Sequence, residues 1–505
     1  MVKSAKGALL ATLQIDKGST TPIYRQLENF LRRLILEGSL PSKQKLPSTR
    51  ELAEELGVSR ITVKTVYEQL ISEGYAEAKT GAGTFVSEGL IPEKPLSQQY
   101  EKTGPALQAQ QFSEIAEKIN ESKASARFGS TLAFRPGVPA LDKFPIKRWN
   151  KYMAAALSQE DRRNLSYGEF YGSESLRKSI ASHLADSRGM QVDHEQIIIT
   201  SGAQQAFVLI SLILLKGSDT VWYENPGHIA GRDIMSLVGA TIAPIPIDKE
   251  GLDLSHAIAR YAKPALIFTT PSHQQPLGIT MSLRRRLALL KYAVDNNAWI
   301  IEDDYDSEFR YRGRPLPALS ALDKNGRVLY VGTFSKSLCS AVRLGYVVIP
   351  HWLRETFAHT RNILGQSSSP LTEQALSQFI NEGRFAEHIR KMRRLYRDRR
   401  DMLLNCLLEN CSDSLIPQQS DAGMHILADL KHGIEDQTAH KALLAHGIDS
   451  LPLSVYCSEP IQRSALVLGF SGVPRKAMPR LTKKLGEKLR SLHQGALLGG
   501  VRPRS

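Results

Sequence analysis

The first regular pattern of apolar and polar positions covers residues 22–37 (PIYRQLENFLRRLILE). Apolar side chains recur there at spacings of three and four residues, which predicts a helix with one buried face. Pro22 suits the first turn of such a helix, and Gly38 and Pro41 mark the point where it ends.

Two further helices are predicted directly after this one. The first of the pair begins at Ser48, where Glu51 completes the Ser-x-x-Glu pattern of a capping box, and it ends at Gly57. The second begins at Ser59 and carries apolar residues at helical spacing up to Gly74.

A hairpin is predicted next, because residues 75–78 and 84–87 resemble strands on either side of a glycine-containing turn. Three helices followed by a hairpin make a winged helix-turn-helix. We assign this small domain to residues 20–87.

The pattern changes after a stretch rich in Pro, Gln, Glu, Lys and Ser, which we interpret as a linker over residues 88–129 with one helix near 111–119. Short β-rich runs then alternate with helical stretches such as 203–215 and 283–296. This alternation predicts an α/β domain over residues 130–494, a mostly parallel sheet with helices on both faces, followed by a tail. The predicted strands are 196–200, 220–223, 241–244, 265–269, 299–302, 327–331 and 343–349.

Length and charge agree with a small domain joined to a large one. A chain of 505 residues is too long for one core, since single cores stop growing near about 250–300 residues. The net charge of +14 favours a polyanionic partner. Much of the excess lies in residues 384–400, which we interpret as a solvated helix face with a role in packing or dimer formation.

Other classes of protein fit poorly. The four cysteines form no C-x-x-C pair, so a disulfide framework is not expected and a cytoplasmic protein is predicted. The longest apolar run, residues 206–215, is about half of what a membrane span needs, so no membrane partner is predicted. No metal site is predicted either.

The second helix of the predicted pair offers polar side chains where such helices meet the base edges of DNA. Arg60 can donate two hydrogen bonds to a guanine, and Arg50 can reach a phosphate or a base. Glycines in the hairpin turn let the backbone approach DNA closely. The predicted DNA-binding residues are Arg50, Arg60, Thr62, Lys64, Thr65, Gly81 and Gly83.

Residues 20–87 resemble the GntR winged-helix family. The segments GSLPSKQKLPSTRELAEELGVSRITVKTVYEQLISEGY and GAGTFV carry the resemblance. It implies double-stranded DNA as a partner and a contact role for Arg50, Arg60, Thr62, Lys64 and the glycines of the wing.

A second group of residues suits an aldehyde cofactor. Lys336 lies in a Thr-Phe-Ser-Lys segment just after a predicted strand. Asp303 and Tyr305 stand two residues apart at the carboxyl end of another strand, so they share one face, where ligands of open α/β sheets collect. Pyridoxal 5'-phosphate (PLP) needs this set: a lysine for the Schiff base, a carboxylate at the pyridine nitrogen and a phenol at the ring oxygen. We therefore predict PLP as the cofactor and Lys336 as the catalytic lysine.

The phosphate of this cofactor needs hydrogen-bond donors and positive charge. Residues 201–204 (SGAQ) lie between a predicted strand and a predicted helix, where free backbone N–H groups can hold an anion. Two hydroxyls and a guanidinium follow near the lysine. The residues predicted to hold the phosphate are Gly202, Ala203, Gln204, Thr333, Ser335 and Arg343.

Residues 130–490 resemble the fold-type I aminotransferases, and the whole chain resembles the MocR/GabR subfamily of GntR regulators. The segments that carry the resemblance are FRPGVPALDKFP, YGEFYGSESLR, ENPGHIAG, TPSHQQPLG, EDDYDSEFRYRG and EHIRKMRRLYRDRR. It implies the roles given above for Lys336, Asp303 and Tyr305. It also implies that Tyr167 reaches the phosphate of the partner subunit, which requires a homodimer.

Three positions depart from these relatives. His228 stands where the subfamily usually has Tyr, and we expect it to cover the cofactor ring. Gln275 replaces an aromatic residue of the subfamily and is kept as a cofactor contact. Val467 aligns with the arginine that holds the substrate carboxylate in aminotransferases, while Arg463 and Arg475 are out of register. An apolar side chain does not replace a bidentate arginine, so an amino acid lacks its expected clamp.

These features predict a PLP-dependent transcriptional regulator that senses a small amine, amino acid or B6 vitamer. As a dimer it would bind an operator with paired half-sites. One alternative is an active aminotransferase with an accessory DNA-binding domain, against which Val467 weighs. If the chain is a regulator, we expect no physiological turnover and at most a residual half-reaction of an aminotransferase. In another alternative, the protein has the aminotransferase fold but does not bind PLP.

Overall fold

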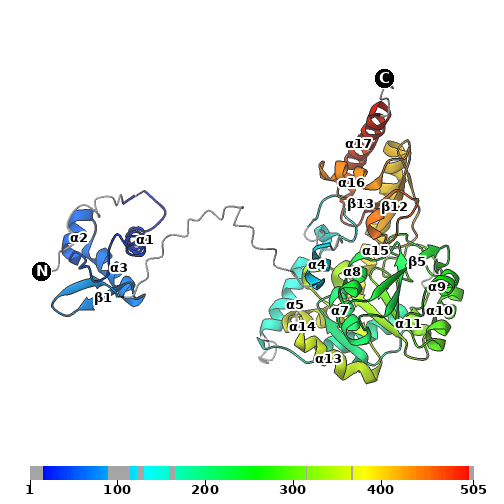
Figure 1. The fold of residues 1–505 in the computed structure, drawn as a ribbon, viewed down its shortest axis with the longest axis horizontal. Helices are drawn as coiled ribbons and strands as arrows, with labels where there is room; N and C mark the ends of the chain where they lie inside the picture. The colour runs from blue at the N-terminus through cyan, green and yellow to red at the C-terminus, as the bar shows by residue number, and fades with distance from the viewer. Residues whose placement is uncertain are drawn as a thin grey trace. The chain divides into compact units, whose positions relative to one another are not determined.

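The chain folds as two compact units, Met1–Gln111 and Phe112–Ser505 (Figure 1). The computed structural model describes residues 15–16, 18–88, 114–121, 130–158, 165–313, 316–365 and 368–499. Of the predicted linker it describes residue 88 and helix α4 (Glu114–Glu121), close to the helix expected near 111–119. The remaining linker positions lie outside the described residues.

The N-terminal unit contains the three predicted helices and the predicted hairpin, which are thereby confirmed. Its core is formed by apolar residues from every one of these elements, including Leu27, Leu52 and Val63. The elements are α1 (Ile23–Leu36), α2 (Thr49–Leu56), α3 (Arg60–Ser72), β1 (Ala76–Lys79) and β2 (Gly83–Val86).

Side-chain caps fix the turn between α2 and α3. The Ser48 hydroxyl accepts from the Glu51 N–H at 3.2 Å, and the Glu51 carboxylate accepts from the Ser48 N–H at 3.0 Å, as the capping box predicts. Gly57 ends α2 with φ 62°, and the Ser59 hydroxyl accepts from Thr62 N–H at 3.0 Å to begin α3. The start of α3 is therefore held in a defined position by local chemistry.

An eight-stranded sheet with the order β3-β10-β9-β8-β7-β4-β5-β6 forms the centre of the C-terminal unit. The strands β9, β8, β7, β4 and β5 run parallel to one another, while β10 is antiparallel to β3 and β9, and β6 is antiparallel to β5. All of the predicted strands are present, and β6 was not predicted. The strands are β3 (Ile197–Thr200), β4 (Thr220–Asn225), β5 (Thr241–Asp248), β6 (Gly251–Leu252), β7 (Leu266–Thr269), β8 (Trp299–Asp304), β9 (Val328–Thr333) and β10 (Gly345–Val348).

Helices cover both faces of this sheet, so its strands are buried on both sides. In β4, Val221 and Tyr223 pack into one cluster with Phe207, whereas Trp222 packs into the opposite cluster with Leu289. The covering helices are α5 (Ile146–Ser158), α6 (Glu174–Arg188), α7 (Ala203–Leu214), α8 (Ile229–Leu237), α9 (Leu254–Arg260), α10 (Leu283–Asp295), α11 (Leu319–Leu322), α12 (Phe334–Ser337), α13 (Arg354–Ile363) and α14 (Pro370–Asn381).

A second, antiparallel sheet with the order β11-β12-β14-β13 lies in the C-terminal part of the same unit. Figure 1 shows it with α16 and α17, apart from the eight-stranded sheet. Helix α17 continues to Gly499, so the tail expected after residue 494 is wrong for residues 495–499. The elements are α15 (Arg384–Cys411), β11 (Leu415–Pro417), β12 (His425–Leu430), α16 (Asp436–Leu444), β13 (Leu451–Pro452), β14 (Ala465–Gly469) and α17 (Met478–Gly499).

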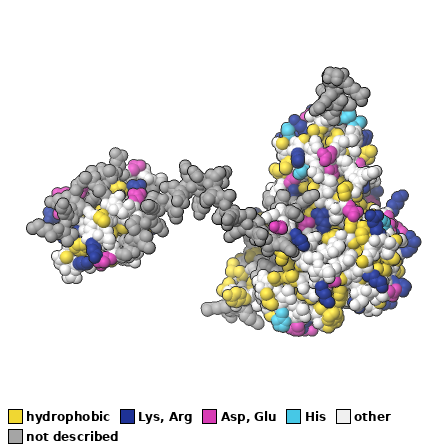
Figure 2. All heavy atoms as spheres, viewed as in Figure 1, with side chains coloured by type: hydrophobic (Ala, Val, Ile, Leu, Met, Phe, Trp, Pro, Cys, Tyr) yellow, Lys and Arg dark blue, Asp and Glu magenta, His cyan; other side chains and the backbone are white. Residues whose placement is uncertain are grey.

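The basic run 384–400 opens α15, and its interpretation as a solvated face is only partly right. Arg399 and Arg400 are buried. Arg399 pairs with Asp142 at 3.1 Å, and Arg400 donates to the Ser420 carbonyl at 2.7 Å. On the face of the C-terminal unit seen in Figure 2, Lys and Arg side chains are scattered among Asp and Glu. No described helix is long and apolar enough to cross a membrane.

Candidate functional site

A cavity of about 580 Å3 opens at the carboxyl ends of the parallel strands in the C-terminal unit. The segments that follow β3, β4, β7, β8 and β9 contribute to its wall, and His425 and Leu451 of the smaller sheet close another side. The structure brings together every predicted cofactor residue except Tyr167. Those that line the cavity are Gly202, Ala203, Gln204, His228, Gln275, Asp303, Tyr305, Thr333, Ser335, Lys336 and Arg343.

The Lys336 amine lies inside this cavity. It donates to the Gly137 carbonyl at 3.0 Å, and the backbone of Gly137 has φ 75°, a conformation that favours glycine. Burial lowers the pKa of Lys336, although the Asp306 and Asp303 carboxylates act in the opposite direction. A lysine with a lowered pKa is more often neutral, which is the form that attacks an aldehyde.

Asp303 lies at the carboxyl end of β8 and is buried, with 3% of its surface exposed. Its Oδ1 atom has no hydrogen-bond partner among the residues that the structure describes. Burial, followed by the nearby Asp304 and Asp306, raises the pKa of Asp303 well above its usual value. A buried carboxyl oxygen needs a donor, and the protonated pyridine nitrogen of PLP would supply one. The residue therefore fits this cofactor.

The opposite end of the cavity suits a phosphate. Gly202 precedes α7 with φ 134°, which leaves the first N–H groups of this helix free to hold an anion. A Cβ at Gly345 would meet the Gly202 Cα at 2.7 Å, so the close approach of the two backbones requires glycine at position 345. The Thr333 hydroxyl caps α12 by accepting from Ser335 N–H at 3.2 Å, and Arg343 adds a positive charge.

Sequence reasoning missed a buried acid, Glu224, which holds the segment that follows β7 at the wall of the cavity. Glu224, near the end of β4, accepts four hydrogen bonds. They come from the Thr269 hydroxyl at 2.6 Å, the Thr270 N–H at 3.0 Å, the Thr270 hydroxyl at 2.6 Å and the Gln274 amide at 3.1 Å. Burial raises the pKa of Glu224, while these donors lower it. The network sets the path of the segment that carries Gln275.

In the N-terminal unit, the predicted DNA-reading residues lie on α2, α3 and the hairpin turn. Arg50, Arg60, Lys64 and Thr65 are exposed, and Thr62 is half-buried beside its cap. Arg60 donates from Nε to the Thr49 hydroxyl at 3.3 Å. The wing glycines Gly81 and Gly83 have φ values of 75° and 113°, and both are exposed.

Comparison with known proteins follows the same division of the chain. The family model of bacterial regulatory proteins of the gntR family matches residues 23–86, and that of aminotransferase class I and II matches residues 137–481. The chain is 37% identical to a probable rhizopine catabolism regulatory protein MocR of Rhizobium meliloti, over 92% of this chain and 93% of that protein. It is 32% identical to the HTH-type pyridoxine biosynthesis transcriptional regulator PdxR of Corynebacterium glutamicum, over 92% and 95% of the two chains.

The chain belongs to the MocR/GabR subfamily of GntR-family transcriptional regulators. Among solved structures, this regulator is similar to a multiple substrate aminotransferase from Thermococcus profundus, with 26% identity and a TM-score of 0.68. That match covers 76% of this chain and 98% of the aminotransferase. The GntR family binds DNA, and the aminotransferase family uses PLP.

Val467 stands at the position where the resemblance predicts the arginine that holds a substrate carboxylate. It is fully buried in β14 and does not itself line the cavity, but it packs in an apolar cluster with Ile229, Leu451 and Tyr456, which do. Arg463 is on the surface, where its Nε atom pairs with Asp429 at 2.6 Å. Arg475 lies on a short exposed helix and does not line the cavity.

Two further positions complete the description of this regulator. Tyr167 is 89% exposed and does not line the cavity of its own chain. Arg135 does line it, held by two contacts of 3.0 Å to the Asp449 carboxylate. The sequence analysis gave Arg135 no role, although the FRPGVPALDKFP segment contains it, because nothing in that segment indicates Asp449 as a partner.

Glu224→Gln should destabilise the C-terminal unit by about 1–3 kcal/mol, because its amide nitrogen would face either the Thr270 N–H at one oxygen position or the Gln274 amide at the other, and it can accept from neither. Urea denaturation followed by tryptophan fluorescence measures this, since all four tryptophans lie in that unit. Glu409→Gln, at an exposed position on α15, is the matched control and should change the unfolding free energy by less than about 0.5 kcal/mol. Equal stability of the two variants would contradict this role for Glu224.

Proposed function

We propose that this protein is a PLP-dependent transcriptional regulator whose aminotransferase-like unit senses a small amine or a B6 vitamer. One observation carries the proposal: the cavity has an amine, an unsatisfied buried carboxyl oxygen and a helix N-terminus at its wall. These groups are complementary to the aldehyde, the pyridine nitrogen and the phosphate of PLP.

In this proposal each group of the cofactor has its own residues. Lys336 binds the aldehyde carbon, Asp303 accepts from the pyridine nitrogen, and Tyr305 donates to the ring oxygen. His228 and Gln275 contact the ring. Residues 202–204, Thr333, Ser335 and Arg343 hold the phosphate. When bound, PLP supplies an electrophilic carbon that exchanges one amine for another, so the cavity becomes reactive toward amines.

A sensor must couple its ligand to DNA binding. A ligand shifts the regulator between two arrangements only if it binds them with different affinity. We propose a homodimer in which Tyr167 of each subunit reaches the other's phosphate site. The exposure of this aromatic side chain supports the proposal, since a tyrosine that is 89% exposed buries almost none of its ring within its own chain. Two winged helices on one dimer then require paired half-sites in the operator.

The chemistry of the cavity favours an effector without an α-carboxylate. Val467 is buried among apolar side chains where a carboxylate clamp would stand. The guanidinium of Arg135 is bound at both Asp449 oxygens, which largely neutralises it. Lys336 and Arg343 bind the cofactor in this proposal, so an ionised carboxylate would lose its hydration without a further cation among the described residues of the cavity wall. The same argument weighs against efficient transamination of amino acids, the alternative function.

Lys336→Ala should abolish the visible absorbance band that the wild-type protein acquires with PLP, because no amine remains to bind the aldehyde. The measurement is an absorbance spectrum of the dialysed protein. Lys324→Ala, in an exposed loop before β9, is the matched control and should keep the band. A wild-type protein without any such band would refute the proposed cofactor.

Arg60→Ala should weaken binding to the operator by about 1–3 kcal/mol, the usual value of a bidentate contact to a base. Fluorescence anisotropy with operator DNA at fixed salt measures the dissociation constant. Arg33→Ala removes an exposed arginine from α1 and should leave that constant nearly unchanged. If both variants bind as tightly as wild type, the orientation assigned to α3 is wrong.

Cadaverine and lysine, which differ by one carboxylate, distinguish a sensor of amines from an aminotransferase. We expect lysine to perturb the cofactor band no faster than cadaverine, because Val467 offers its carboxylate no partner. A carboxylate clamp would instead favour lysine by roughly tenfold or more, the value of one charge-assisted hydrogen bond. Stopped-flow absorbance gives both rates. Multiple turnovers of lysine with an added keto acid would support the enzyme alternative.

A further inference from the structure

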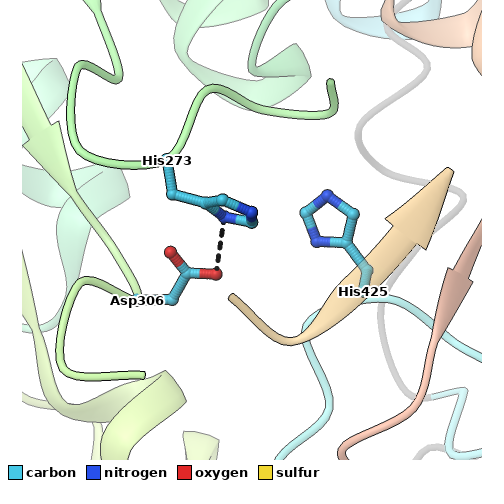
Figure 3. Close-up of side chains that lie close together, drawn as sticks. All are labelled: His273, Asp306 and His425. Atoms are coloured by element: carbon cyan, nitrogen blue, oxygen red, sulfur yellow. Dashed lines mark hydrogen bonds and ion pairs between the residues drawn. The ribbon is translucent and has the colours of Figure 1, made fainter. Parts of the chain in front are cut away.

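Three buried side chains meet beside the cavity, and the proposed function gives them no role: His273, Asp306 and His425 (Figure 3). His273 lies in the segment after β7, Asp306 in the segment after β8, and His425 is the first residue of β12. The side chains of His273 and Asp306 are each 1% exposed. In Figure 3 the His273 ring stands between the Asp306 carboxylate and the His425 ring.

The hydrogen bonds of His273 define its protonation. Its Nδ1 atom lies 3.1 Å from Asp306 Oδ2 and 3.0 Å from the Tyr305 hydroxyl oxygen. An ionised carboxylate oxygen only accepts, so Nδ1 carries the hydrogen and shares it between these two oxygens. The Tyr305 oxygen is then an acceptor toward His273. Its own hydrogen is free to point elsewhere, and Tyr305 lines the cavity.

The fold holds this imidazole tightly. A Cβ at Gly423, which has φ 82°, would stand 1.9 Å from the ring, and one at Gly278, with φ 75°, would stand 3.2 Å from Nε2. The Ser420 hydroxyl, which donates to the Ala422 carbonyl at 2.6 Å, lies 3.5 Å from Nε2. The two glycines and the hydrogen bonds at Nδ1 thus fix the plane of the His273 ring.

His425 packs against the His273 ring, and its own hydrogen bond goes to the backbone rather than to Tyr305. Its Nε2 atom lies 3.1 Å from the Pro276 carbonyl, which only accepts, so Nε2 carries a hydrogen. Burial, with His273 nearby, lowers the pKa of His425 to about 3, so the ring is neutral at pH 7. The hydrogen on His273 Nδ1 has Asp306 and Tyr305 as acceptors, and the hydrogen on His425 Nε2 has the Pro276 carbonyl, so both imidazoles are bound without a metal ion. Hydrogen bonding therefore accounts for this cluster better than a cation does.

We propose that His273, held by Asp306, is a positioning residue that turns the hydrogen of the Tyr305 hydroxyl into the cavity, toward the ring oxygen of bound PLP. The inference rests on the proposed function, since it requires that the cavity binds this cofactor. Burial raises the pKa of Tyr305 well above its usual value, with Asp306 and Asp303 adding to the effect, so the phenol keeps its hydrogen.

The orientation has a spectroscopic consequence. The nitrogen of Lys336 would lie next to the ring oxygen of the bound cofactor. When this nitrogen loses its proton, a negative charge stays on the ring oxygen, and a hydrogen-bond donor there stabilises that charge. It thereby lowers the pH at which the absorbance band changes to its high-pH form. Asp306 and His425 face His273, and Asp303, Asp306, Glu224 and Tyr456 face Tyr305. Each variant keeps all of these groups except the residue that is substituted. A difference in the pH midpoint between variants therefore reports the hydrogen bond of Tyr305.

The test is a pH titration of the absorbance of full-length protein with PLP. We expect the midpoint to rise by about one pH unit in His273→Leu and in Tyr305→Phe, the size of one hydrogen bond to a charged group. The double variant should rise no further, because both substitutions remove the same donor. His273→Asn, whose amide N–H can take the place of Nδ1–H, should recover most of the wild-type midpoint.

A wild-type midpoint in a folded His273→Leu that binds PLP would overturn the positioning role and leave the proposed function intact. Additive shifts in the double variant would do the same. If His273→Leu does not fold, His273→Gln takes its place, since a Gln amide reaches the position of Nε2 and not that of Nδ1, and it must raise the midpoint. One equivalent of tightly bound zinc that His273→Asn loses would assign the cluster to a metal instead. Failure of the wild-type protein to bind PLP would remove the proposed function itself, which the Lys336→Ala comparison detects separately.

Discussion

The site depends on the free-energy cost of burying carboxyl groups at the end of β8. Glu302, Asp303 and Asp304 follow one another there, and all three are buried. Glu302 accepts from the N–H groups of Leu319 and Ser320 at 2.8 Å, and Asp304 pairs with Arg188 at 2.8 Å. Because alternate residues of a strand point to opposite faces, Glu302 and Asp304 meet their partners on one side and Asp303 is presented to the cavity on the other.

Much of this arrangement could be predicted from the sequence, because the signals are local. A buried parallel strand is a continuous apolar run, and a phosphate-binding turn lies between such a run and a helix. The strand ends therefore predict that Asp303, Lys336 and residues 202–204 lie together, and these residues line one cavity. The capping box at Ser48 is local in the same sense.

Other features could not be predicted, because they depend on partners that are distant in the chain. Arg135 meets Asp449 across 314 positions, and the smaller sheet includes a strand, β13, of only two residues. His273 meets Asp306 and His425 only because loops from two sheets converge. The burial of Arg399 was missed since a charge pattern cannot indicate that Asp142 and the Ser471 carbonyl bind its guanidinium.

The Asp449 carboxylate, which binds Arg135, also connects two parts of the cavity wall. Ser130 is the first described residue after the linker, and its hydroxyl donates to the same Asp449 carboxylate at 2.5 Å. Ser130 and Arg135 both line the cavity. The wall of the cavity therefore includes two groups that bind the same carboxylate, one of them at the start of the described residues 130–158. A ligand that draws Arg135 away from Asp449 would leave this carboxylate with the Ser130 hydroxyl as its remaining partner of the pair, so the same contact would report the occupancy of the cavity.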